Sequence, residues 1–154
     1  MDLKSLAVKS LVGVHSLFLK DLNALPEEAF SQKFGGETRT VADIVYEVNL
    51  VNDHIGMVVR GEEPFPWPED EGFIKAPSDF VGKEAIIAAF DESMQKIIQT
   101  AELMTSEELE GMVTTESGET TRFQRFQFIA FHMWYHSGQF NFIQALRGDG
   151  EWHW

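Results

Sequence analysis

The chain has 154 residues, 44% of them hydrophobic, which predicts a folded protein with a substantial core rather than a disordered one. Its formal net charge of −13 argues against a nucleic-acid partner, because nucleic-acid-binding faces are basic. Cysteine is absent, which excludes disulfides and cysteine-ligated zinc, and no apolar run reaches the roughly 18–20 residues of a membrane span, so we expect a cytoplasmic protein.

The first two predicted helices carry apolar stripes. Residues 3–25 repeat apolar side chains at helical spacing. Thr40 and Asp43 then form a pattern close to a capping box, which predicts the start of a second helix. Branched apolar residues recur every three or four positions along this second helix until Gly61, where we expect it to end.

Residues 61–82 form a long connection that carries four of the five prolines of the chain. We expect it to lie on the surface, pinned to the core by Phe65, Trp67, Phe73 and Phe80. A loop of this length in a single domain is often functional, and we expect it to wall a pocket over the end of the bundle.

The remaining chain predicts two more long helices. The first covers about residues 83–104, and Thr105 begins a short helix after it. Residues 114–121 are polar and predict a turn or small hairpin, after which a capping box at Thr121 opens a helix to about Arg147. Four long amphipathic segments without a convincing set of strands predict an all-α four-helix bundle, with residues 1–154 forming one domain.

Two histidines stand out in the last helix. His132 and His136 are four residues apart, so they lie one turn apart on the same face. Two imidazoles at this spacing can bind one metal ion, but the spacing also fits two structural histidines in the core. A metal site in a bundle needs a third ligand from a facing helix.

The second helix offers two candidates for that ligand. Glu47 lies on the apolar stripe, where a carboxylate is costly unless a cation, a donor or a metal satisfies it. A structural alternative is a hydrogen bond from Glu47 to Tyr135 or Arg125. His54 lies two turns further along the same stripe, either as a ligand, as a neighbour of the site, or facing solvent.

The segments "TVADIVYEV" (residues 40–48) and "FHMWYHSGQF" (residues 131–140) resemble the DinB/YfiT-like superfamily of four-helix bundles, and the resemblance covers essentially the whole chain. It implies a divalent metal, commonly zinc or nickel, bound by one histidine of the second helix and two of the fourth. His132 and His136 match the latter pair, whereas Glu47 stands where the other histidine is expected. Glutamate is a competent oxygen ligand, so the resemblance implies a site of Glu47, His132 and His136.

The resemblance also implies an activity on a small molecule. Members of the superfamily include metal-dependent transferases that use a thiol such as bacillithiol, mycothiol or glutathione, and we expect such a thiol transferase or a related hydrolase. We expect Gln139 and His153 to be neighbours of the site; no further catalytic residue is indicated. The tail "GDGEWHW" (residues 148–154), with Trp152 and Trp154, is expected to fold back on the bundle or dock a second subunit.

A competing hypothesis is that the protein has no catalytic activity and serves to bind a partner. The last helix is apolar nearly all round, with Phe128, Phe131, Trp134 and Phe142 on several faces, which is typical of a helix covered on more than one side. A homodimer formed through this helix would explain that pattern. The protein would then be a non-catalytic interaction bundle with a degenerate metal site.

Overall fold

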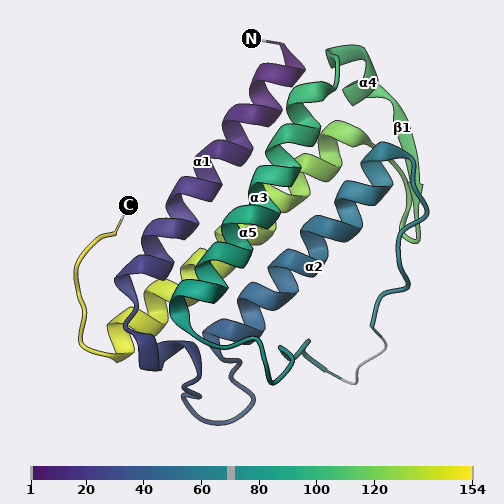
Figure 1. The fold of residues 1–154 in the computed structure, drawn as a ribbon. Helices are drawn as coiled ribbons and strands as arrows, with labels where there is room; N and C mark the ends of the chain where they lie inside the picture. Colours follow the sequence, from purple (N-terminus) through teal and green to yellow (C-terminus); the bar gives the residue numbers. More distant parts are fainter. Residues whose placement is uncertain (1, 69–71, 154) are drawn as a thin grey trace.

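A computed structural model describes residues 2–68 and 72–153, and four long helices dominate it (Figure 1). These helices are α1 (Leu3–Ala24), α2 (Val41–Arg60), α3 (Lys83–Leu103) and α5 (Arg122–Leu146). The shorter elements are the 3-10 helix η1 (Glu27–Phe30), α4 (Ser106–Glu110), and strands β1 (Met112–Thr115) and β2 (Gly118–Thr121). The predicted fold class, a four-helix bundle with a long gap between its second and third long helices, is confirmed.

The only strands among the described residues form the small hairpin between α4 and α5. β1 and β2 are antiparallel, and Thr115 pairs with Gly118 next to the turn. Gly118 has a φ of 110°, which a residue with a side chain rarely adopts, so glycine suits this turn. The hairpin places the start of α5 beside the end of α2, where Arg122 Nε donates to the Val59 carbonyl oxygen at 2.8 Å. The helices α2 and α5 are therefore antiparallel.

Local capping fixes where α2, α4 and α5 begin. Capping boxes at Thr40, Thr105 and Thr121 are all present, each closed by the side chain three residues later. At the other end of α2, Gly61 adopts the left-handed conformation and its N–H bonds back to the last turn. These local interactions set the positions of the helices that carry the candidate ligands.

The core lies between the four long helices. Phe18 of α1 contacts Phe90 of α3 and Phe140 of α5, with ring centroids 4.7 and 4.9 Å apart. The valines and isoleucines of the α2 stripe are buried as predicted. No helix in the described ranges is both long and apolar enough to cross a membrane.

The loop 61–82 follows its prediction in part. Trp67 and Phe80 pack against the core, and Phe65 meets the His54 ring edge to face at 5.3 Å. The expectation that Phe73 reaches the core is wrong, because its side chain is 56% exposed. Phe73 instead lies under the guanidinium of Arg39, 4.7 Å from the ring centroid, so a cation–π contact holds it at the rim.

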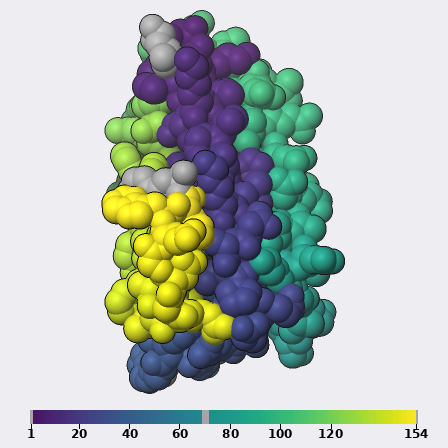
Figure 2. Space-filling model, turned by 90° about the vertical axis from the view of Figure 1, so that its left-hand side faces the viewer, coloured from purple at the N-terminus to yellow at the C-terminus, as the bar shows by residue number. Residues whose placement is uncertain are grey.

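The C-terminal segment folds back along the bundle beside α1 (Figure 2). Trp152 and Glu151 line a surface hollow together with Trp134, Ser137 and Asn141 of α5. This arrangement matches one of the two expectations for the tail; Trp154 lies outside the described residues.

Candidate metal site

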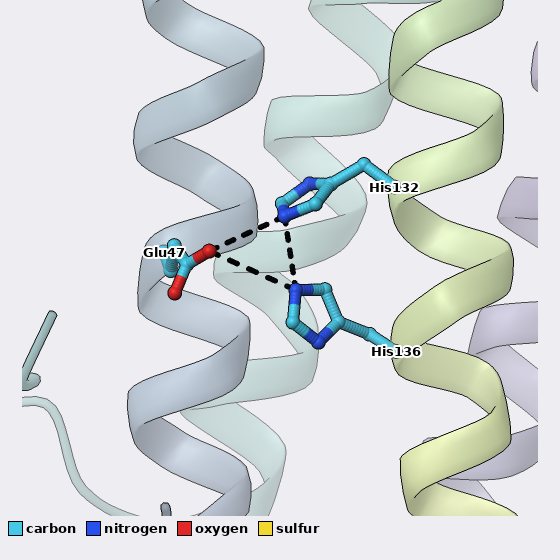
Figure 3. Close-up of side chains that lie close together, drawn as sticks. All are labelled: Glu47, His132 and His136. Carbon is cyan, nitrogen blue, oxygen red and sulfur yellow. Dashed lines mark hydrogen bonds and ion pairs between the residues drawn. The ribbon is translucent and has the colours of Figure 1, made fainter. Parts of the chain in front are cut away.

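Three side chains from two helices converge at mid-bundle (Figure 3). Glu47 points from α2 towards α5, which presents His132 and His136 one turn apart. Glu47 Oε1 lies 3.3 Å from His132 Nε2 and 3.8 Å from His136 Nε2, and the two Nε2 atoms are 2.9 Å apart. One ligand atom from each residue lies within 4.8 Å of the others, so this triad could hold a metal ion.

Hydrogen bonding selects the tautomer of His136. Its Nδ1 lies 2.7 Å from Gln139 Oε1, an atom that can only accept a hydrogen bond. Arg39 Nη2, a donor, also lies 3.4 Å from this Nδ1, but the shorter contact with Gln139 favours a proton on Nδ1, which leaves the Nε2 lone pair facing Glu47 and His132. A metal-ligating imidazole is normally held in this way by a partner on its other nitrogen. The expectation that Gln139 neighbours the site is thus consistent with the geometry.

Both imidazoles are neutral at physiological pH. The pKa of His136 is lowered to about 3, chiefly by burial; the hydrogen bond with Gln139 acts in the opposite direction, and His132 and Arg39 add to the lowering. Burial is also the main cause that lowers the pKa of His132 to about 4, with Arg39 adding to it. Neutral imidazoles are the form that binds metals, so little proton competition is expected at neutral pH.

Arg39 is the residue that sequence reasoning missed. Its Nη1 forms an ion pair with Glu47 Oε2, and only 8% of the Arg39 side chain and 18% of the Glu47 side chain are exposed. The expected structural alternative, a hydrogen bond from Glu47 to Tyr135 or Arg125, is wrong, because the carboxylate is satisfied by Arg39 and the histidines. Arg39 precedes the N-cap of α2, so no helical spacing links it to Glu47.

The other histidines stay apart from the triad. His54 lies against the rings of Phe65 and Trp67, and its Nδ1 is buried without a hydrogen-bond partner. His153 bonds through Nε2 to Asp149 Oδ2 at 2.8 Å in the tail and is not part of the cluster that could hold a metal, so its place beside the site stays a prediction. The structure therefore leaves Glu47 as the third member of the cluster.

A pocket of about 520 Å³ opens beside the triad along the C-terminal half of α5. Its lining includes Phe34, Arg39, Phe73, Tyr135, Gln139 and Phe142. Arg39 and Gln139 belong to both pocket and site, since Arg39 also contacts Glu47 and His136, and Gln139 contacts His136. Phe73 contributes the wall that we expected from the loop 61–82. A small molecule in this pocket would lie next to the triad.

The sequence model of the DinB superfamily matches residues 9–140, which include all three candidate ligands. The chain belongs to the DinB superfamily. A structural comparison agrees with this fold assignment: the crystal structure of a conserved protein from Enterococcus faecalis superposes with a TM-score of 0.71. That similarity covers 95% of this chain and 97% of the other, at 13% sequence identity, and so concerns the fold alone. Among curated proteins no significant sequence match is found.

Proposed function

We propose that this DinB-superfamily protein binds one divalent metal, zinc or nickel, through Glu47, His132 and His136. The observation that supports this proposal is the convergence of two neutral imidazoles and a carboxylate beside a pocket. Two nitrogens and one oxygen suit zinc, and three protein ligands are typical of catalytic sites that keep a coordination position for a water or a substrate. Imidazole is also a suitable ligand for nickel.

We further propose that the protein is a thiol S-transferase or a related hydrolase acting on a small molecule. When bound, the metal would supply a Lewis acid that lowers the pKa of a coordinated thiol or water. The side chains of the chain itself have separate tasks: Gln139 orients His136, and Arg39 holds the Glu47 carboxylate in place. Phe73 and Phe142 wall the adjacent pocket, where they would exclude water from a bound substrate.

Calorimetric titration of tag-free, metal-stripped protein tests the binding proposal. Zinc and nickel are each expected to bind at one ion per chain, and His132→Ala/His136→Ala to abolish binding. His15→Ala is a matched control, because His15 lies on α1 and bonds to Asp91 at 2.7 Å, outside the triad. Binding that survives in the double variant would contradict the proposal.

A separate assay tests the activity. Transfer of bacillithiol, mycothiol or glutathione to an electrophile should stop in the chelated protein and return when zinc or nickel is restored. Since the double histidine variant cannot be reloaded, it should remain inactive under both conditions. A rate that is the same with and without chelator would overturn the proposed metal-dependent transfer.

A second candidate function is supported by the outer face of α5. Phe131, Tyr135 and Phe142 follow one helical stripe and are 67%, 63% and 65% exposed. Since contiguous exposed apolar patches mark interaction sites, we propose that two copies of the chain associate through this stripe as a homodimer. In this alternative the bundle is an interaction module whose metal site is degenerate.

Sedimentation analysis separates the two candidates when it is combined with the metal titration. The wild-type chain should sediment as a dimer and Phe131→Lys/Phe142→Lys as a monomer. Leu103→Lys is the matched control, because Leu103 is 77% exposed but lies on α3. A dimer without metal binding would favour the interaction module, and a monomeric wild type would exclude association through α5.

A further inference from the structure

A second cavity, of about 220 Å³, lies between α2 and α5 on the other side of the triad from the 520 Å³ pocket. His54 follows Glu47 by seven residues on α2, and Arg125 precedes His132 by seven on α5. Because the two helices are antiparallel, both displacements run in the same direction, about 10 Å along the bundle. One small molecule could therefore reach from the cavity to the triad.

Two buried nitrogens at this cavity lack partners. Arg125 Nε and His54 Nδ1 are both shielded from water and make no hydrogen bond. Among the described residues, no carboxylate forms an ion pair with Arg125, although Glu116 of the hairpin turn lines the same cavity. Burial lowers the pKa of the Arg125 guanidinium, and no neighbouring anion offsets that effect.

An arginine that is half-buried without an anion is unfavourable, because the side chain stays charged at any physiological pH. The contact that Arg125 does make is with an aromatic face, since its guanidinium carbon lies 5.2 Å from the Phe128 ring centroid. This stacking holds the guanidinium plane but uses none of its N–H donors. Those donors remain available for a ligand.

The geometry points to a carboxylate-binding subsite at Arg125 and His54. The planar guanidinium fork matches a carboxylate, and His54 Nδ1 can supply a further donor. Trp67 and Phe128 give the cavity aromatic walls. A volume of 220 Å³ is below the range of whole small-molecule sites, so the cavity suits one end of a ligand rather than a complete one.

The ligand class that follows is a small molecule with a carboxylate about 10 Å from the group that reaches the triad. The idea that this subsite anchors the substrate of the metal rests on the proposed function. Carboxylate binding at Arg125 does not depend on that function. Glu116 lines the same cavity, so its negative charge disfavours an incoming carboxylate.

Titration of metal-free protein with glutarate, followed through the Arg125 Nε–H resonance and by calorimetry, tests the subsite. Glutarate should bind and its neutral diamide, glutaramide, should not. Arg125→Met should weaken glutarate binding by at least about tenfold, the usual value of a charge-assisted hydrogen bond. His54→Ala should weaken it less, and Glu116→Gln should strengthen it.

Arg60→Met is the matched control, because Arg60 is paired with Glu62 on the surface at 2.7 Å. Removing an unpaired, half-buried charge should leave Arg125→Met folded, which its thermal transition checks. Glutarate affinity that is unchanged in Arg125→Met, or equal to that of glutaramide, would overturn the subsite. Zinc titration of Arg125→Met separates the two proposals. If Arg125 serves only the subsite, this variant should bind zinc as the wild type does. Failure of zinc binding in the wild type would count against the metal proposal alone.

Discussion

At the scale of single residues, the site depends on how the two oxygens of Glu47 are divided. Oε1 faces the histidines, and Oε2 is held by Arg39. A metal at the triad would therefore use one oxygen while Arg39 kept the other, so Arg39 acts as a positioning residue rather than a competitor. Carboxylate ligands in metal sites are commonly fixed by such a partner.

Replacing Arg39 by methionine should leave Glu47 as a half-buried charge with no cation. Metal-free Arg39→Met is expected to lose about 2–4 kcal/mol of unfolding free energy, somewhat below the cost of breaking a fully buried pair. Zinc should restore more stability to this variant than to wild type, because the metal neutralises the unpaired carboxylate. Urea denaturation with and without zinc measures both effects.

Phe73→Leu controls for the lost cation–π contact between Arg39 and Phe73, which it removes without changing any charge. It should cost about 1 kcal/mol, as expected for a cation–π pair whose ring is exposed. If metal-free Arg39→Met were as stable as wild type, the ion pair would not be what holds Glu47.

At the scale of the elements, α5 is positioned by a buried polar cluster as well as by apolar packing. The carboxylate of Asp21 on α1 accepts hydrogen bonds from the hydroxyl of Ser137 and, at 3.0 Å, from Asn141 Nδ2. Gln144 Nε2 donates to the Asp21 carbonyl oxygen at 3.2 Å. Ser137 follows His136 directly, so this cluster fixes the rotation of the helix that presents the histidines to Glu47.

Asp21 gives a pH test of this interface. The residue is fully buried, and burial raises its pKa although Ser137 and Asn141 act in the opposite direction. A group whose pKa is raised in the folded state contributes stability below its unfolded pKa and loses it as the pH rises through the folded pKa. The wild type should therefore lose stability relative to Asp21→Asn between about pH 4 and about pH 7.

The test is the difference in unfolding free energy between Asp21→Asn and wild type, measured on metal-free protein at both pH values. Because the remaining titrating groups are shared, their contributions cancel in this difference, apart from that of His153, whose charge acts on Asp21. A difference that is independent of pH would mean that Asp21 titrates in the folded chain as it does in the unfolded one.

The same elements show what local sequence can predict. Capping boxes at Thr40 and Thr121 and the glycine at position 61 act within a few residues, so helix ends could be placed from the sequence. The cluster of Asp21 and Ser137 joins residues 116 positions apart, and no local rule pairs them. The triad could be predicted from the sequence because a helical stripe and the family resemblance both selected Glu47. The contact with Arg39 could not be predicted, since it depends on how the loop before α2 returns to the bundle.

At the scale of the whole molecule, the triad lies between the 520 Å³ pocket and the 220 Å³ cavity. The larger one shares Arg39 and Gln139 with the site, and the smaller one lies about two turns away at Arg125. Because α2 and α5 provide every ligand, a metal at the triad would clamp the two helices together. Its binding energy would then add to the stability of the fold.

Metal removal should accordingly lower the melting temperature. Free zinc at about a hundred times its dissociation constant contributes about 2.7 kcal/mol, which corresponds to roughly 5–10 °C for a chain of this size. Calorimetric scans with zinc and with a chelator measure the shift. The double histidine variant should show no shift, and an equal shift in that variant would place the stabilising zinc elsewhere.

The most direct test of the metal site is a crystal structure of the zinc-loaded protein with anomalous data collected across the zinc edge. One anomalous peak per chain is expected, bonded to Glu47 Oε1, His132 Nε2 and His136 Nε2 at about 2.0–2.2 Å. Arg39 should remain on Glu47 Oε2. A peak bound by other residues, or no peak at the triad in a crystal grown with excess zinc, would contradict it.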